Sequence, residues 1–142
     1  LMTIHVHIPG QPVGKGRARI GKVGAHARMF TPAKTVSYES TVAMFAAQAM
    51  AGRPLLTCPV NLQMRVDFAI PASWSQKKQR AAEAGLILPK VKPDADNVIK
   101  AVCDAINGVV WVDDVQVVDL TLKKRYSVQP GVAVRIDLVE GE

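Results

Sequence analysis

Apolar and polar residues alternate along four stretches of the chain, and this alternation predicts four β-strands. The clearest stretch is residues 60–70, in which nearly every second residue is a large apolar one. Residues 3–8 and 132–138 alternate in the same way, and residues 115–126 do so less regularly. Successive side chains of a strand point to opposite faces, so each strand is expected to bury one face. A turn at Pro130-Gly131 predicts that the last two strands form a hairpin.

Residues 32–51 have the spacing and the end signals of a long α-helix. Thr31 can cap it, Pro32 suits the first helical position, and Gly52 can end it. The apolar side of this helix is predicted to contain Val36, Val42, Phe45 and Ala46.

A second long helix is predicted from about Asn97 to Ile106. Pro93 keeps the backbone before it out of helical geometry, so Asp96 is the predicted N-cap. The predicted apolar arc contains Ile99, Val102, Cys103 and Ile106. Gly108 suits the left-handed position after the last turn, and residues 109–112 are predicted to begin a short strand.

These elements describe an α+β domain, with a mixed sheet of about four to five strands packed against two main helices. The 142 residues suffice for one domain with a modest core, and residues 1–142 are expected to form it. Hydrophobic residues make up 49% of the chain, which excludes a disordered protein. Met2 is expected to be the natural first residue, with Leu1 added before it.

Several partners and compartments are excluded by what the chain lacks. No apolar run reaches the length of a membrane span and no secretory signal is visible, so we expect a cytoplasmic protein without a membrane partner. Cys58 and Cys103 lie in apolar surroundings and lack the spacing of zinc ligands. They are expected to be reduced core residues.

Acidic residues gather in one stretch of an otherwise basic chain. Residues 92–116 contain Asp94, Asp96, Asp104, Asp113 and Asp114, arranged as D-x-D before the second helix and D-D after it. Neighbouring carboxylates raise each other's pKa, so such a gathering is unfavourable without a counter-ion. A hard divalent cation such as Mg²⁺ prefers oxygen ligands and would make it favourable.

The predicted helix also brings a lysine into this group. Asp96, Lys100 and Asp104 are spaced four residues apart and line one polar stripe. Taken one at a time, the acids have simpler explanations: Asp96 as a cap, Asp94 as a solvated residue, and Asp113-Asp114 as a turn. A calcium loop of the EF-hand type is excluded, because the residues after D-x-D supply none of its later ligands.

The formal net charge of +6 is a weak indicator of nucleic-acid binding by itself. Because the acids are concentrated in one stretch, the rest of the chain is more basic than this figure. A positive surface around a local acidic site is typical of a phosphodiester nuclease.

Two basic segments are candidates for DNA contacts. Residues 9–27 are predicted to form a long Gly-rich loop that carries Lys15, Arg17 and Arg19. Residues 73–84 are predicted to form a short helix capped by Ser73 or Ser75. The basic residues of that helix are Lys77, Lys78 and Arg80, and Trp74 beside them can stack on a base or pack locally. The alternative for both segments is a solvated surface.

The acidic stretch resembles the signature of the RusA-type Holliday junction resolvases, endonucleases of phage and prophage origin. The matching sequence, residues 92–117, is KPDADNVIKAVCDAINGVVWVDDVQV. Weaker resemblance extends to Phe30-Thr31-Pro32, Thr35 and Tyr38-Glu39. The resemblance implies that Asp94, Asp96 and Asp114 bind the catalytic metal, with Asp113 as the fallback for Asp114. It places the catalytic lysine at Lys100 and a further acid of the motif at Asp104.

The same resemblance implies an activity and partners. The expected activity is cleavage of four-way DNA junctions during recombination and repair, by paired symmetric nicks. The expected cofactor is Mg²⁺, which Mn²⁺ is expected to be able to replace, with no nucleotide cofactor. A homodimer is expected, because two nicks need two symmetric active sites.

Two other classes of function fit parts of the sequence. A DNA-binding protein with structural acids would bind junctions or duplexes without Mg²⁺ and without cutting. A metal-dependent phosphatase would hydrolyse small phosphate esters, although such a substrate does not require a basic surface.

Overall fold

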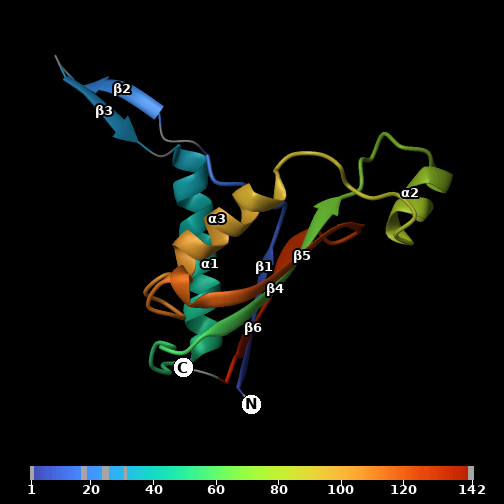
Figure 1. The fold of residues 1–142 in the computed structure, drawn as a ribbon. Helices are drawn as coiled ribbons and strands as arrows, with labels where there is room; N and C mark the ends of the chain where they lie inside the picture. Colours follow the sequence, from blue (N-terminus) through green and yellow to red (C-terminus); the bar gives the residue numbers. More distant parts are fainter. Residues whose placement is uncertain (1, 17–18, 24–25, 31, 141–142) are drawn as a thin grey trace.

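A computed structural model describes residues 2–16, 19–23, 26–30 and 32–140, without the side chains of residues 19–30. Its elements, in chain order, are β1 (Thr3–Pro9), β2 (Arg19–Val23), β3 (His26–Phe30), α1 (Ala33–Met50), β4 (Val60–Ala69), α2 (Gln76–Glu83), α3 (Ala95–Ile106), the short 3₁₀ helix η1 (Asp114–Gln116), β5 (Val117–Ser127) and β6 (Gly131–Leu138). The chain is a single α+β domain, as predicted (Figure 1). Among the described helices, none has the length and hydropathy needed to span a bilayer.

The main sheet has four strands in the order β1-β6-β4-β5. Strands β4 and β5 are parallel, whereas β6 is antiparallel to both β1 and β4, so the sheet is mixed as predicted. The predicted hairpin between the last two strands is wrong, because β6 pairs with β1 and β4. The crossover through α2 and α3 places β5 parallel to β4 at the sheet edge, and β6 then returns on the other side of β4.

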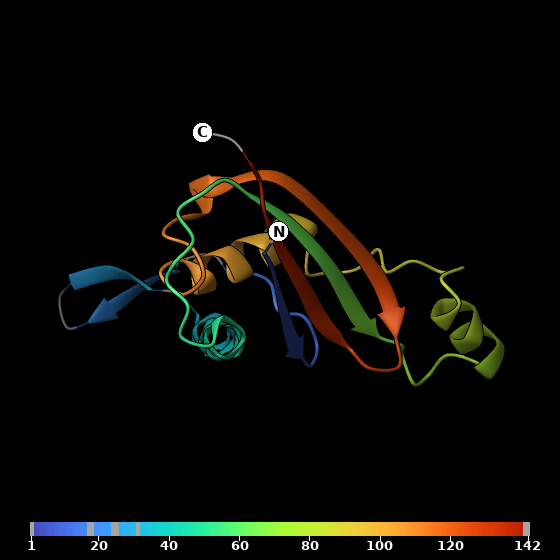
Figure 2. The same ribbon diagram turned by 90° about the horizontal axis from the view of Figure 1, so that it is seen from below.

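One face of the sheet packs against α1 and α3 (Figure 2). On β4 the buried residues alternate as predicted, and they are Val60, Leu62, Met64, Val66 and Phe68. Helix α3 buries a wide stripe, which consists of Val98, Ala101, Val102, Cys103, Ala105 and Ile106. This packing fixes α3 across the sheet and leaves the start of the helix free for a site.

Helix α1 has the predicted extent, and its predicted apolar side is confirmed except at Val36: Val42 and Ala46 are buried, and Phe45 is partly buried against the core. Its buried residues are Thr35, Tyr38, Val42, Ala46 and Met50, whereas Val36 is 50% exposed. Many alanines make this helix only weakly amphipathic, so its sequence defines the buried side poorly. It ends at Ala51 in the left-handed conformation, one residue before the predicted Gly52.

The predicted long loop over residues 9–27 is wrong in its second half. Strands β2 and β3 form an antiparallel hairpin that extends beyond the start of α1 (Figure 1). Each strand has five residues and Gly21 interrupts the first, so the alternation is too short to be recognised. Helix α2 lies at the opposite end of the molecule in both views, and Ser75 caps it by accepting from the Lys78 N–H.

Candidate active site

Helix α3 begins two residues earlier than predicted. Its N-cap is Asp94, not Asp96, and Asp96 lies in the first turn. Asp94 has extended backbone angles after Pro93, and its side chain makes no capping hydrogen bond. The carboxylates of Asp94 and Asp96 have no hydrogen bond or ion pair with another described residue, so both are available to a ligand. Negative charge in the first turn is also favoured by the helix dipole.

The structure brings three of the predicted site residues together. Asp96, Lys100 and Asp114 line one pocket of about 450 Å³, which we call the Asp96 pocket. Asp96 and Lys100 come from α3 and Asp114 from η1, so the pocket forms where the crossover helix meets the start of β5. The rest of its wall is apolar and consists of Leu62, Ile99, Cys103, Val117, Val118 and Leu120.

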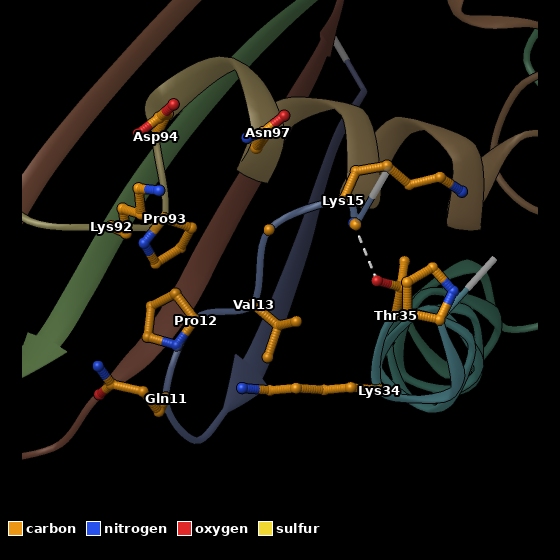
Figure 3. Close-up of a pocket in the computed structure, with 13 residues that line it drawn as sticks. Gln11, Pro12, Val13, Lys15, Lys34, Thr35, Lys92, Pro93, Asp94 and Asn97 are labelled. Carbon is orange, nitrogen blue, oxygen red and sulfur yellow. Dashed lines mark hydrogen bonds between the residues drawn. The ribbon is translucent and has the colours of Figure 1, made fainter. Parts of the chain in front are cut away.

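Asp94 lies on a different side of the helix start. It lines a second pocket of about 740 Å³, the Asp94 pocket, which Figure 3 shows. Residues two apart in a helix do not face each other, which explains why Asp94 and Asp96 diverge. Three lysines also line this pocket, namely Lys15, Lys34 and Lys92.

Two close approaches hold the segment before β2 against α1 and α3. A Cβ on Gly14 would lie 2.7 Å from the Pro93 Cβ, and a Cβ on Gly16 would lie 2.8 Å from the Pro32 Cγ. The intervening Lys15 N–H donates to the Asn97 carbonyl at 2.8 Å, and the Gly16 N–H donates to Thr35 Oγ1 at 2.9 Å (Figure 3). Only glycine permits both approaches.

Asp114 is placed by a turn, because the strand predicted over residues 109–112 does not form. Instead Trp111 makes single β-bridges to Leu56 and Asn107, and it is fully buried. Its indole Nε1–H donates to Asn107 Oδ1 at 2.6 Å, and the Asn107 amide reaches Asp114 Oδ2 at 3.5 Å. The run of valines around Trp111 suggested a strand, but these hydrogen bonds favour a compact turn.

Gln116 locks this turn to the neighbouring loop. Its Oε1 accepts from the N–H groups of Val112 and Asp113, and its Nε2 donates to the carbonyls of Leu56 and Cys58. The sequence placed Asn107 beside Gly108 at the end of the helix, and Trp111 and Gln116 within the family signature, but it predicted none of these hydrogen bonds. The sequence feature that could have indicated these hydrogen bonds is the presence of polar groups within an apolar run, because such groups need internal partners once they are buried.

The structure also distinguishes the two adjacent aspartates. Asp114 is partly buried and faces the Asp96 pocket, whereas Asp113 is exposed and lines neither of the two pockets described above. This difference favours Asp114 over the fallback Asp113 as the site residue.

Lys100 and Asp104 form an ion pair along α3, with Lys100 Nζ 3.0 Å from Asp104 Oδ1. Lys15 Nζ lies 3.2 Å from the other oxygen of Asp104 and also pairs with Glu39. The hydrogen bond and the charge of Asp104 raise the pKa of Lys100, with a smaller contribution from Asp114. Lys100 is therefore an ammonium ion at neutral pH. Burial raises the pKa of the nearby Cys103 thiol to about 12.

The carboxylates of the Asp96 pocket are the groups that could hold a metal ion. Over the described part of the chain, no three His, Cys, Asp or Glu side chains lie close enough together to hold a metal ion. Asp96 and Asp114 nevertheless share one pocket, and Mg²⁺ is commonly held by one or two carboxylates together with waters and substrate phosphates. The two carboxylates fit that mode, whereas Asp94 lines the neighbouring pocket.

The predicted DNA-contacting residues have different surroundings. Lys77, Lys78 and Arg80 are exposed on α2, and Lys78 lies 3.9 Å from the Trp74 ring. Trp74 packs edge-on against Tyr126, which corresponds to the local-packing alternative. Arg17 lies outside the described residues, and Arg19 lies on β2, whose side chains are not described.

Comparison with known proteins identifies the family of this chain. Residues 9–137 match the model of the family described as endodeoxyribonuclease RusA. Over 131 residues the chain is also 41% identical to the uncharacterized protein YqaN of Bacillus subtilis (strain 168). This alignment covers 89% of this chain and 90% of that protein. The chain therefore belongs to the RusA endodeoxyribonuclease family.

Proposed function

We propose that this protein is a Mg²⁺-dependent endonuclease that resolves four-way (Holliday) DNA junctions by paired symmetric nicks. The observation that carries the proposal is the meeting of Asp96, Asp114 and Lys100 in one pocket of a RusA-family chain. Two carboxylates can hold a divalent ion for metal-assisted hydrolysis, and an ammonium ion beside them can bind the phosphate.

Each residue has a distinct role in this proposal. Asp96 and Asp114 would hold the metal ion. Asp94, the third ligand that the family resemblance implies, lines the neighbouring pocket and would have to turn its side chain toward the ion to bind it. A bound ion would act as a Lewis acid and would lower the pKa of a water molecule. Lys100 binds a non-bridging oxygen of the scissile phosphate, because its raised pKa keeps it charged.

The two ends of the molecule would extend the contact to DNA. Helix α2, with Lys77, Lys78 and Arg80, lies on one side of the start of α3, and the β2–β3 hairpin lies on the other (Figures 1 and 2). The hairpin carries Arg19, and the segment that leads into it carries Arg17. Basic groups at both ends suit the phosphates of two different arms of a junction.

A homodimer would explain the apolar surface around the Asp96 pocket. Strand β5 is an edge of the sheet, and exposed apolar residues lie on it and just before it, namely Val112, Val115, Val118 and Leu120. An edge strand with an exposed apolar surface is prone to pair with another chain. Two copies related by a two-fold axis would present two equivalent sites, as paired nicks require.

The direct test is cleavage of a synthetic mobile four-way junction, with Mg²⁺ and with EDTA, beside an Asp96→Asn variant. Symmetric nicks that need both Mg²⁺ and Asp96 are expected, and Mn²⁺ is expected to replace Mg²⁺. Tight binding without a cut in either metal would contradict the proposal.

One observation favours the second candidate, a junction-binding protein that does not cut. In the portion of the chain that the structure describes, no three-ligand cluster is preformed. This candidate predicts binding that is insensitive to Mg²⁺ and unchanged in the Asp96→Asn variant. A divalent ion that strengthens junction binding in the wild type but not in the variant would exclude it.

A further inference from the structure

Four alternating charges connect three parts of the fold to the Asp96 pocket. In order they are Glu39 on α1, Lys15 in the segment before β2, and Asp104 and Lys100 on α3. Lys15 bridges Glu39 and Asp104, and Asp104 bridges Lys15 and Lys100. Lys100 is the member that lines the pocket together with Asp96 and Asp114.

The four charged side chains differ in their exposed fractions. The side chains of Lys15, Glu39 and Asp104 are 21–23% exposed, whereas that of Lys100 is 60% exposed. A phosphate would have to compete with two carboxylates for the Lys15 ammonium. Lys100 has one described carboxylate partner and lies at the surface, so its ammonium is the accessible one of the two lysine ammonium groups.

Lys15 is also fixed through its backbone. Its N–H donates to the Asn97 carbonyl at 2.8 Å, and the glycines on both sides are pressed against Pro93 and Pro32. A lysine anchored at both its backbone and its ammonium loses little further freedom on forming the ion pair with Asp104. The entropy that normally weakens an exposed ion pair is therefore reduced.

Asp104 gains a defined orientation from this arrangement. Lys15 holds its Oδ2 at 3.2 Å, which leaves Oδ1 facing Lys100 at 3.0 Å. Without Lys15, the carboxylate could rotate and Lys100 could follow it away from the pocket. An exposed i,i+4 ion pair stabilises only weakly by itself, so the pair on α3 alone would restrain Lys100 weakly.

We infer that Asp104, Lys15 and Glu39 are positioning residues that hold the Lys100 ammonium beside the Asp96 pocket, and that Lys15 acts through Lys100 and does not contact DNA. The inference rests on the proposed function for its effect on cleavage. It differs from the expectation that Lys15 is a DNA-contacting residue, and it assigns a role to Asp104.

The first test needs no catalysis. Lysine ammonium groups of the free protein are observed by ¹⁵N-edited NMR, and the mobility of the Lys100 Nζ is measured in the wild type, Lys15→Met and Asp104→Asn. The inference expects Lys100 Nζ to become more mobile in both variants, and Lys90→Met, an exposed lysine outside the chain of charges, to leave it unchanged. An unchanged Lys100 in Lys15→Met would overturn the inference even if the protein never cuts DNA.

The second test separates positioning from DNA contact in the cleaving enzyme. Misplacing a catalytic group commonly costs about 10- to 100-fold in rate, so Lys15→Met is expected to lower the single-turnover rate at saturating junction within that range. Junction affinity should stay within about twofold, because the Lys15 ammonium is already paired with Glu39 and Asp104 and is not free for a phosphate. Lys15→Arg should recover part of the rate, because it restores a cation for Asp104 and Glu39.

Lys77→Met provides the contrast for a direct DNA contact. It is expected to weaken junction binding and to reduce the dependence of binding on salt. If Lys15→Met behaves like Lys77→Met, Lys15 is a DNA contact and the inference is wrong. A wild type that does not cut contradicts the proposed function alone, because the NMR test still decides the positioning role. Thermal unfolding of each variant confirms that the comparison is made on folded protein.

Discussion

The two adjacent aspartates after α3 illustrate how one residue decides whether a carboxylate reaches the site. Asp114 enters η1 and faces the Asp96 pocket, whereas Asp113 stays exposed. The Asn107 amide lies near Asp114 and connects it to the buried Trp111. The family resemblance implied the same choice, but spacing alone could not distinguish neighbours in a turn.

This difference predicts the outcome of a matched pair of substitutions. Asp114→Asn is expected to lower the cleavage rate about 10²-fold or more, the scale of losing one major electrostatic contribution to a transition state. Asp113→Asn is expected to have a much smaller effect. Single-turnover cleavage of the same junction measures both, and equal losses would contradict the assignment of Asp114.

Lys100 yields a prediction about pH. Its pKa is raised above the ordinary lysine value by Asp104, so the group stays protonated through the neutral and mildly alkaline range. The contribution of Lys100 should therefore persist from pH 7 to about pH 9.5, below the ordinary lysine pKa of about 10.4. The ratio of wild-type to Lys100→Gln cleavage rates, measured across this range, should stay constant. A ratio that falls toward 1 by pH 9 would show that Lys100 loses its proton earlier.

At the scale of elements, the start of α3 brings the site together. The acidic motif, the helix after it and the strands on either side could be predicted from the sequence, because their periodicity and end signals are strong. The N-cap was misplaced by two residues, since Asp94 and Asp96 are equally suitable capping residues by type. The separation of these two acids into different pockets follows from the helical rotation once the true start is known.

Other elements could not be predicted for different physical reasons. The partners of β5 depend on which side of β4 the chain returns, and no local pattern encodes that choice. The β2–β3 hairpin consists of strands too short and too polar to show alternation. Sequence spacing indicated only the Lys100–Asp104 pair of the four connected charges. The other two ion pairs join residues that are 24 and 89 positions apart.

The close packing at Gly14 predicts a backbone effect on the site. Gly14→Ala places a Cβ 2.7 Å from the Pro93 Cβ and 3.0 Å from the Asn97 Cβ, so the start of α3 must shift. Overpacking of this kind typically costs about 1–3 kcal/mol, and cleavage should fall together with the free energy of unfolding. Chemical denaturation and cleavage assays measure the two effects. Ser37→Ala, at an exposed position of α1, is the control and should change neither. A Gly14→Ala protein with wild-type stability would show that this approach is not tight.

At the scale of the whole molecule, an acidic site lies between two basic ends. The hairpin and α2 extend in opposite directions (Figures 1 and 2). Exposed apolar residues at β5 adjoin the Asp96 pocket. A monomer with this shape offers one site for one strand. The proposed resolution of a junction requires two sites in a fixed relation, so the proposed dimer is part of the proposed function.

The surface at β5 predicts how the proposed dimer can be broken. Val118→Glu is expected to shift the protein from dimer to monomer, because Val118 is 57% exposed on the edge strand and two copies would bring two new charges together. Multi-angle light scattering measures the mass, and Thr121→Glu on the same strand is the control for a charge added at a polar position. A Val118→Glu protein that remains a dimer would place the interface elsewhere.

We propose that Asp96-dependent sites cut a junction in symmetric pairs. A supercoiled plasmid that extrudes a cruciform tests it most directly, because two nicks made within one binding event give a linear product and one nick gives an open circle. With Mg²⁺ the wild type is expected to give mainly linear DNA, and Asp96→Asn is expected to give neither product while still binding the cruciform. Open circles alone would contradict the paired mechanism. A plasmid that the wild type leaves uncut would contradict the proposed cleavage itself.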